Sequence, residues 1–230
     1  MILVVAEQRE GVLNRASWEP VIAAQRTGDP VKIVLLGKDI AAPAAELAAA
    51  AVAEVLQVEH DALAAYTSDG HVHALAGILA AEQPSLVFYA HTYQTRDFAA
   101  ALAARLDRTI LTDVVGSKAS GEGLAFVRPM FQAKLFADVR PRGPEPHFVS
   151  FQIGSFRLDD LQKGASPAPV RVVQADFSGA TIRQQPEPPF REAKQAVDLT
   201  QAERIVSVGR GITEIEAKAK GIKIEKAVFP

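Results

Sequence analysis

The first ninety residues alternate short apolar runs with alanine-rich segments, and this alternation limits the possible folds more than any other feature. Runs rich in β-branched residues predict four strands, at residues 2–6, 31–36, 55–58 and 86–90. The segments between them carry apolar residues at helical spacing, as at Trp18, Val21 and Ile22 or at Leu75 and Ile78. Strands that alternate with helices form parallel sheets with crossover connections. The sequence therefore predicts an α/β fold, a Rossmann-like parallel sheet with helices on both faces.

After Leu106 the pattern changes to short strands separated by glycine and proline. Strands are expected at residues 110–115, 124–128, 134–139, 147–153 and 170–175. We expect these to be short antiparallel strands or arms that are added to the parallel core. The extended, proline-rich stretch at 184–189 is the best domain boundary. We therefore predict an N-terminal scaffold domain at 1–190, and a linker and the start of a truncated domain at 191–230.

Composition excludes several classes of function. A formal net charge of -2 argues against nucleic-acid binding, which needs a basic face. The chain has no cysteine, so thiolate chemistry and disulfides are excluded and any redox chemistry must come from a cofactor. The N-terminus lacks the basic region of a signal peptide, and no run approaches the roughly 20 apolar residues that span a bilayer. We expect a cytoplasmic protein without direct membrane insertion.

The motifs of common enzyme classes are missing from the sequence. It contains no G-x-x-x-x-G-K-[ST] loop, no strand followed by G-x-G-x-x-G, no H-E-x-x-H and no G-x-S-x-G. Its five histidines do not favour a metal site, because His71 and His73 stand two apart and would point to different faces of a helix. Nucleotide-hydrolysing, dehydrogenase and hydrolase functions therefore lose support.

Two polar segments have both a functional and a structural interpretation. Residues 91–97 follow the fourth strand, where open α/β sheets bind ligands, so they could contact a polar ligand or partner. A helix start is favoured instead, in which Thr92 or Thr95 caps and Asp97 complements the helix dipole. Cations beside rigid turns, at 128–130 and 140–142, could serve an interface, but a solvated face is favoured.

A glycine loop follows a predicted strand at 205–208. Gly209 and Gly211 would let the backbone approach a pyrophosphate, and Arg210 would supply a fixed planar charge. A surface loop is the default interpretation of such a short motif. Only nineteen residues follow Gly211, fewer than the roughly 30 of another βαβ unit.

Taken together, six segments resemble the α subunit of electron-transfer flavoproteins. They lie at residues 2–7, 93–97, 111–114, 127–131, 151–157 and 202–211. The resemblance covers residues 1 to about 212. It implies an adenine nucleotide α-hydrolase-like scaffold that packs against a structurally related β subunit, with FAD held mainly by the α subunit's C-terminal domain. The family's loop at Gly209, Arg210 and Gly211 contacts FAD, so these three residues are the expected cofactor-binding residues.

The resemblance implies a heterodimeric electron carrier that is not itself catalytic. Its FAD would accept electrons from acyl-CoA or other dehydrogenases, as in fatty acid β-oxidation, and deliver them to a membrane quinone oxidoreductase. Residues 213–230 depart from the family's pattern, so we expect this chain alone to bind FAD weakly or not at all. A scaffold domain without its partner should also expose an apolar patch.

An alternative from another class is a stand-alone adenine-nucleotide-binding or scaffold module without flavin. Its ligand would bind near the end of the first strand. Against it, no phosphate-gripping glycine loop follows residues 2–6, where the only nearby glycine is Gly11. A hydrolytic enzyme is a more distant third, because no pairing of nucleophile and base can be identified.

Overall fold

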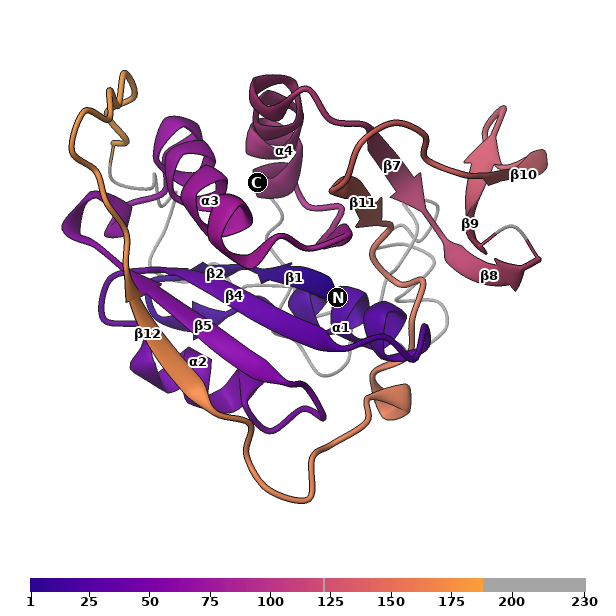
Figure 1. Cartoon of the computed structure of the whole chain (residues 1–230), viewed down its shortest axis with the longest axis horizontal. Helices are drawn as coiled ribbons and strands as arrows, with labels where there is room; N and C mark the ends of the chain where they lie inside the picture. Colours follow the sequence, from indigo (N-terminus) through magenta and orange to yellow (C-terminus); the bar gives the residue numbers. More distant parts are fainter. Residues whose placement is uncertain (122, 188–230) are drawn as a thin grey trace, which may run out of the picture. The chain divides into compact units, whose positions relative to one another are not determined.

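A seven-stranded parallel sheet forms the centre of the protein (Figure 1). The computed structural model describes residues 1–121 and 123–187, and Met1–Pro186 form one compact unit. The strand order is β12-β5-β4-β1-β6-β11-β7, and every neighbouring pair is parallel. The strands are β1 (Ile2–Ala6), β4 (Val31–Gly37), β5 (Glu54–Glu59), β6 (Leu86–Ala90), β7 (Ile110–Val114), β11 (His147–Phe151) and β12 (Val170–Gln174).

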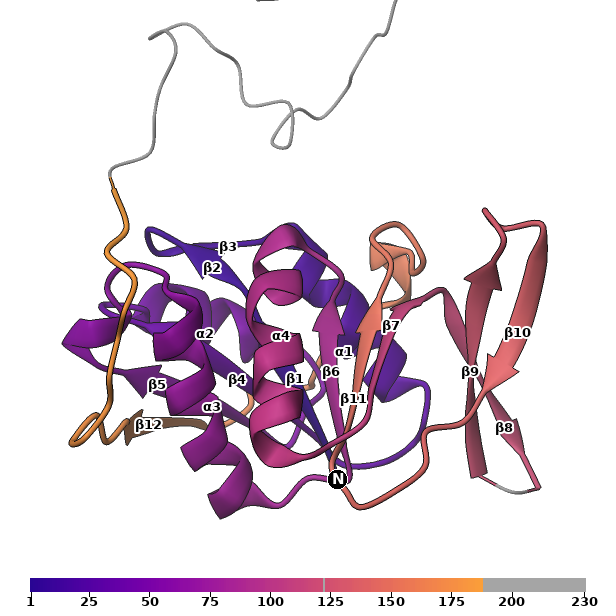
Figure 2. The ribbon, with the colours of Figure 1, turned by 90° about the horizontal axis from the view of Figure 1, so that it is seen from above.

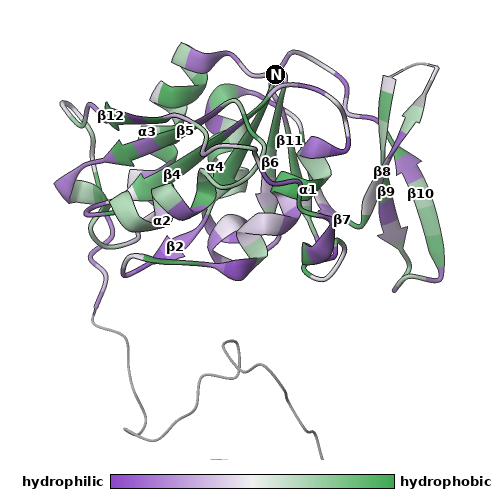
Figure 3. Ribbon diagram, turned by 90° about the horizontal axis from the view of Figure 1, so that it is seen from below, coloured by the Kyte–Doolittle hydropathy of each residue, from purple (hydrophilic) through white to green (hydrophobic). Residues whose placement is uncertain are grey.

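Helices cover both faces of this sheet (Figure 1), which explains why its strands are apolar on both sides. The helices are α1 (Trp18–Gln25), α2 (Ala41–Leu47), α3 (Ser68–Glu82) and α4 (Tyr93–Leu106). Along β1, Val4 packs with residues of α1 and α2, whereas Leu3 and Val5 pack with residues of α3 and α4. The hydropathy colouring shows the apolar sheet strands between these two layers (Figure 3). The predicted fold class is confirmed.

Three antiparallel strands form a separate arm next to β7 (Figure 2). The arm consists of β8 (Gly116–Ser120), β9 (Gly123–Met130) and β10 (Leu135–Val139), with β9 in the middle. A two-stranded hairpin, β2 (Gln8–Arg9) and β3 (Val12–Leu13), follows β1, and short 3-10 turns occur at η1 (Arg15–Ser17), η2 (Asp61–Leu63) and η3 (Leu158–Asp160).

The expectation of antiparallel additions is confirmed for residues 124–139 and wrong for three other strands. β7, β11 and β12 all join the parallel sheet. β11 lies between β6 and β7 and pairs with both. Its residues 148–151 are buried, which is typical of a central strand of a parallel sheet that is covered on both faces. The arm takes the place of a crossover helix between β7 and β11. β8 was not predicted, because its residues, Gly116–Ser120, are mostly small or polar and have low strand propensity.

Ion pairs hold β12 at the edge of the sheet. Arg171 on β12 binds Glu54 at 2.8 Å and Glu82 at 2.6 Å, and Lys32 binds the same two carboxylates at 2.9 and 2.7 Å. Hydrogen bonding from Arg171 lowers the pKa of Glu54 to about 2. This network of four charges ties the last strand to β4, β5 and the end of α3.

The chain leaves this unit across the N-terminal end of α3. The Arg183 guanidinium donates to both oxygens of Asp69, at 2.7 and 3.1 Å, and the Gln184 side chain accepts from the Asp69 backbone N–H. The predicted boundary at 190 and the predicted second domain at 191–230 lie outside the described residues. Within the described part of the chain, no helix has the length and apolar character needed to cross a membrane.

Candidate functional site

The point where the strand order reverses lies between β1 and β6, and the protein's own side chains fill it. Glu7 follows β1 directly, and Thr92 follows β6. One oxygen of the Glu7 carboxylate accepts from the Thr92 hydroxyl at 2.5 Å, and the other accepts from the Asn14 amide at 2.8 Å. The Ser17 hydroxyl accepts from the Glu7 backbone N–H at 2.8 Å. A phosphate at this position would meet a carboxylate, which opposes the adenine-nucleotide alternative.

Thr92 is the N-cap of α4, as the helix-start interpretation of 91–97 expects. Its hydroxyl accepts from the Thr95 backbone N–H at 3.0 Å, so Thr92 and not Thr95 is the cap. The Asp97 carboxylate accepts from the Tyr66 hydroxyl at 2.6 Å. Burial and this contact raise the pKa of Tyr66 above its ordinary value. The role of Asp97 is therefore to join α4 to the segment before α3.

His91 lines a cavity of about 560 Å³ formed by α4, β7, β9 and β11. We call it the arginine cavity, and its polar lining residues are His91, Thr95, Arg96, Thr112, Asp113, Arg128 and Ser150. The His91 Nδ1 and the Ser150 hydroxyl are 2.9 Å apart, and the same hydroxyl accepts from the Asp113 backbone N–H at 3.4 Å. Burial lowers the pKa of His91, so its ring is neutral at pH 7.

The prediction that residues 128–130 form a solvated face is wrong for Arg128. Its side chain lies half-buried in the wall of the arginine cavity, and its Nε is buried without a hydrogen-bond acceptor. Arg140 and Arg142 are exposed, as predicted, beside a hollow of about 420 Å³. The local pattern of cation and proline is the same in both places, but only Arg128 lies on the strand that packs beside β7.

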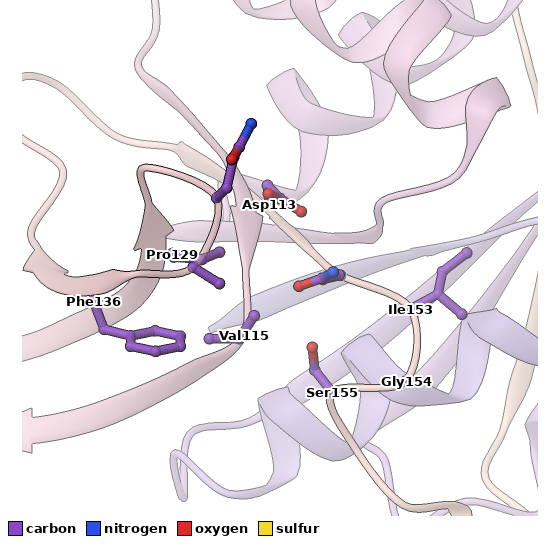
Figure 4. Close-up of a pocket in the computed structure, with 10 residues that line it drawn as sticks. Asp113, Val115, Pro129, Phe136, Ile153, Gly154 and Ser155 are labelled. Carbon is purple, nitrogen blue, oxygen red and sulfur yellow. The ribbon is translucent and has the colours of Figure 1, made fainter.

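A second cavity, of about 610 Å³, lies between the arm and the loop after β11. We call it the arm cavity. In Figure 4, Phe136 of the arm and Ser155 of the loop lie on opposite sides of Val115. Asp113 lines both cavities, so they adjoin at the end of β7. The arm cavity therefore opens where the arm meets the sheet.

The loop that forms one wall of the arm cavity is held by a buried carboxylate. Glu19 on α1 accepts from the Gly154 backbone N–H at 2.8 and 2.9 Å and from the Phe156 backbone N–H at 3.1 Å. Gly154 has φ +90°, a conformation that favours glycine. Sequence reasoning missed Glu19, although a charge next to Trp18 within an apolar helical stripe was a signal. Glu19 fixes the loop against α1.

The turn of the arm lies at the other wall. Phe131, Gln132 and Ala133 all have positive φ, at 52°, 59° and 62°. Non-glycine residues rarely adopt this region, and three in succession are costly. The turn leaves Phe131 72% exposed.

The two central histidines point to different faces of α3, as predicted. His71 is buried against Tyr66 and Phe98, and burial lowers its pKa to about 4. His73 lies 2.7 Å from the Asp176 backbone oxygen. Among residues 1–121 and 123–187 no group of three or more histidines and carboxylates could hold a metal ion. Gly209, Arg210 and Gly211, the predicted cofactor-binding residues, lie outside the described residues.

Comparison with known proteins identifies a family. The electron transfer flavoprotein domain matches residues 2–178. The electron transfer flavoprotein subunit alpha of Bacillus subtilis is 29% identical over 218 residues, which are 94% of this chain and 66% of the relative. The proteins of the same name from Syntrophomonas wolfei and Thermoanaerobacterium thermosaccharolyticum are each 29% identical, over 90% and 92% of this chain. The chain spans 64–66% of the length of these three relatives.

Proposed function

This chain belongs to the electron transfer flavoprotein family, and from that premise we propose that it acts as the α subunit of a heterodimeric electron carrier. Its partner is a β subunit, and the two together hold FAD. The carrier takes electrons from dehydrogenases, such as acyl-CoA dehydrogenases, and passes them to a membrane quinone oxidoreductase. The chain is a carrier subunit and not a catalyst, because the redox chemistry belongs to the flavin.

The described residues fit a scaffold better than a flavin site. Glu7 occupies the crevice where an open α/β sheet would take a phosphate, and its carboxylate is already bound to Thr92 and Asn14. We therefore assign residues 1–187 a structural role. In this proposal the FAD contacts come from Arg210, with Gly209 and Gly211, and from the β subunit.

The observation that carries the proposal is the apolar surface around the arm cavity. Phe131, Leu135 and Phe136 are 72%, 61% and 60% exposed on the arm, and Ile153 is 55% exposed on the facing loop. Hydrophobic residues continue along β10 (Figure 3). Of these, Phe136 and Ile153 both line the arm cavity, and large apolar side chains exposed side by side are typical of a protein interface. We propose that the β subunit covers this surface.

Co-expression with the β subunit tests this assignment. The full chain and its partner should co-purify with flavin absorption bands, whereas the chain alone should show weak bands or none. Phe136→Asp should abolish the complex, because it places a charge in the centre of the apolar surface. Val172→Asp is the matched control, since Val172 is 55% exposed on β12 at the opposite edge of the sheet. A flavin-loaded complex that survives Phe136→Asp would contradict the proposed interface.

Arg210 is tested in the assembled heterodimer. Arg210→Ala should weaken FAD retention or shift the reduction potential of the flavin, because a positive charge near the pyrophosphate or the anionic reduced flavin is lost. Unchanged retention and an unchanged potential would remove Arg210 from the site while leaving the subunit assignment intact.

A further inference from the structure

We propose that the arginine cavity binds a compact oxyanion, the phosphate or carboxylate group of a small molecule. The cavity holds about 560 Å³, within the range of small-molecule sites. It lies in the scaffold unit, and no step of the proposed electron transfer uses it. The inference therefore goes beyond the proposed function and does not depend on it.

The wall of the arginine cavity carries a net positive charge. Arg96 and Arg128 contribute two positive charges and Asp113 one negative charge, which leaves one unit of positive charge because His91 is neutral. Among the described residues, neither guanidinium lies within 4.0 Å of a carboxylate oxygen, and the Arg96 guanidinium carbon lies 5.7 Å from the centroid of the Tyr93 ring. The wall thus offers cationic charge that the protein does not neutralise.

Arg128 lacks the carboxylate partner that other arginines of the same unit have. Arg26, Arg171 and Arg183 each bind a carboxylate, at distances of 2.6 to 2.8 Å. These three lie on the surface, where an unpaired guanidinium would be solvated at little cost. Arg128 is half-buried, and its Nε is buried without an acceptor, yet it has no such partner. An external anion would supply the missing counter-charge of Arg128.

The remaining residues that line the arginine cavity have hydroxyl or small apolar side chains. Thr95, Thr112 and Ser150 place hydroxyls in the wall, and Ala99 and Ile110 provide small apolar surface. Planar guanidinium groups bind carboxylate and phosphate oxygens in pairs, and hydroxyls add donors. The cavity therefore suits a ligand with one oxyanion group and a short apolar stem.

Isothermal titration of the full chain tests the site, with inorganic phosphate and malonate as separate probes at constant ionic strength. Each probe that fits should bind saturably with one site per chain. Arg128→Gln should weaken binding at least tenfold and Arg96→Gln at least threefold, because each removes a charge and keeps a polar side chain. Lys38→Gln is the matched control: Lys38 is an exposed cation paired with Asp61, outside the cavity, and its loss should leave binding unchanged.

The outcomes separate the two sources of the oxyanion. Saturable binding of phosphate alone identifies a phosphate-bearing ligand, and binding of malonate alone identifies a carboxylate. The absence of saturable binding by both probes, or binding that neither arginine variant weakens, would overturn the proposal. Arg96 is exposed on α4, so Arg96→Gln carries the test if Arg128→Gln does not fold. The titration needs neither FAD nor the β subunit, so its failure would leave the proposed function standing.

Discussion

The parallel sheet and the arm are both built from strands, but they bury their side chains very differently. In the sheet, every residue of β1 is buried, and Phe88 of β6 has no exposed surface. In the arm, Ala125 and Phe126 are buried against the sheet, whereas all of β10 is at least partly exposed. Within the described residues the apolar side chains of the sheet are covered, whereas large apolar side chains of the arm remain exposed.

Backbone strain divides in the same way. In the sheet unit, the left-handed residues Gln83 and Asp107 end α3 and α4, and their backbone N–H groups bond to carbonyls of the last turn. In the arm, three left-handed residues follow one another at 131–133. Such conformations cost roughly 1–3 kcal/mol each and concentrate at functional segments. Single left-handed residues also occur in the sheet unit, at Glu10, Asp39 and Asp113, but among the described residues three in succession occur only in the arm, which also carries the exposed Phe131 and Phe136.

The largest expected effect comes from the sheet. Phe88→Ala should lower the free energy of unfolding by about 3–5 kcal/mol, since it opens a cavity. The Phe88 ring packs edge-on against Phe126 and Phe151, with centroids 5.9 and 4.9 Å away. Urea unfolding of the full chain measures the loss. A loss below about 1 kcal/mol would mean that the sheet tolerates truncation as the arm does, so the two regions would not differ in how much their stability depends on packing.

Acid should act on the sheet unit through His71. Burial lowers its pKa to about 4 in the folded state against 6.5 in the unfolded state, so the unfolded chain binds the extra proton between these values. Stability from this group is complete above pH 6.5 and is lost as the pH falls toward 4, by about 3 kcal/mol in total. Unfolding free energies at pH 7 and pH 4.5 measure the change.

His71→Leu should flatten that pH dependence, because the unfolded chain no longer binds a proton at position 71 that the folded chain does not bind. The remaining slope belongs to other groups, including His91. An unchanged slope in His71→Leu would show that acid destabilises the protein elsewhere.

The loop beside the arm cavity should have an intermediate effect. Glu19→Ala should cost about 2–3 kcal/mol, because it leaves the backbone N–H groups of Gly154 and Phe156 without their charged acceptor. Glu19→Gln keeps one acceptor oxygen and should cost less. Equal losses in the two variants, measured by urea unfolding, would show that helix packing and not the carboxylate holds the loop.

Strain in the arm should give a smaller change of opposite sign. Gln132→Gly should raise the free energy of unfolding by about 0.5–1 kcal/mol, since glycine adopts the left-handed region without a steric cost. Lys134→Gly is the control, because Lys134 is exposed in the same turn and its φ is not positive. Equal stability changes in the two variants would argue against strain at this turn.

The smallest expected stability change is at Phe136 on the arm. Phe136→Ala removes the same atoms as Phe88→Ala, but from a ring that is already mostly solvated. Unfolding of the chain alone should change by no more than about 0.5 kcal/mol, while affinity for the β subunit falls at least tenfold. A large stability loss in the chain alone would assign the ring to the fold and not to the interface.

Predictions from sequence succeeded where the structure depends on local residues, and failed where it depends on residues far away in the chain. The four strands of the first half were found because their apolar runs are local and continuous. The direction of β7, β11 and β12 was predicted wrongly, because strand direction depends on partners that a local pattern does not contain. The nearly continuous apolar run at Phe148, Val149 and Phe151 could have indicated a central strand that is buried on both faces.

Site residues were harder to predict than strands. Glu19 accepts hydrogen bonds from a loop 135 residues away, and the Glu7 carboxylate accepts one from Thr92, which is 85 residues away. Arg128 was expected in solvent because the rule used only its neighbours in sequence. The roles of Gly209, Arg210 and Gly211 remain predictions.

The order of the strands in the sheet also governs how the chain assembles during synthesis. β7 pairs within the sheet only with β11, so neither β7 nor the arm can join the sheet before residue 151 has left the ribosome. β5 gains its outer neighbour later still, because that neighbour, β12, is complete only when Gln174 has been synthesised. A nascent chain of this protein therefore carries two open strand edges through much of its translation, at β5 and β6, and such edges are what chaperones protect from aggregation.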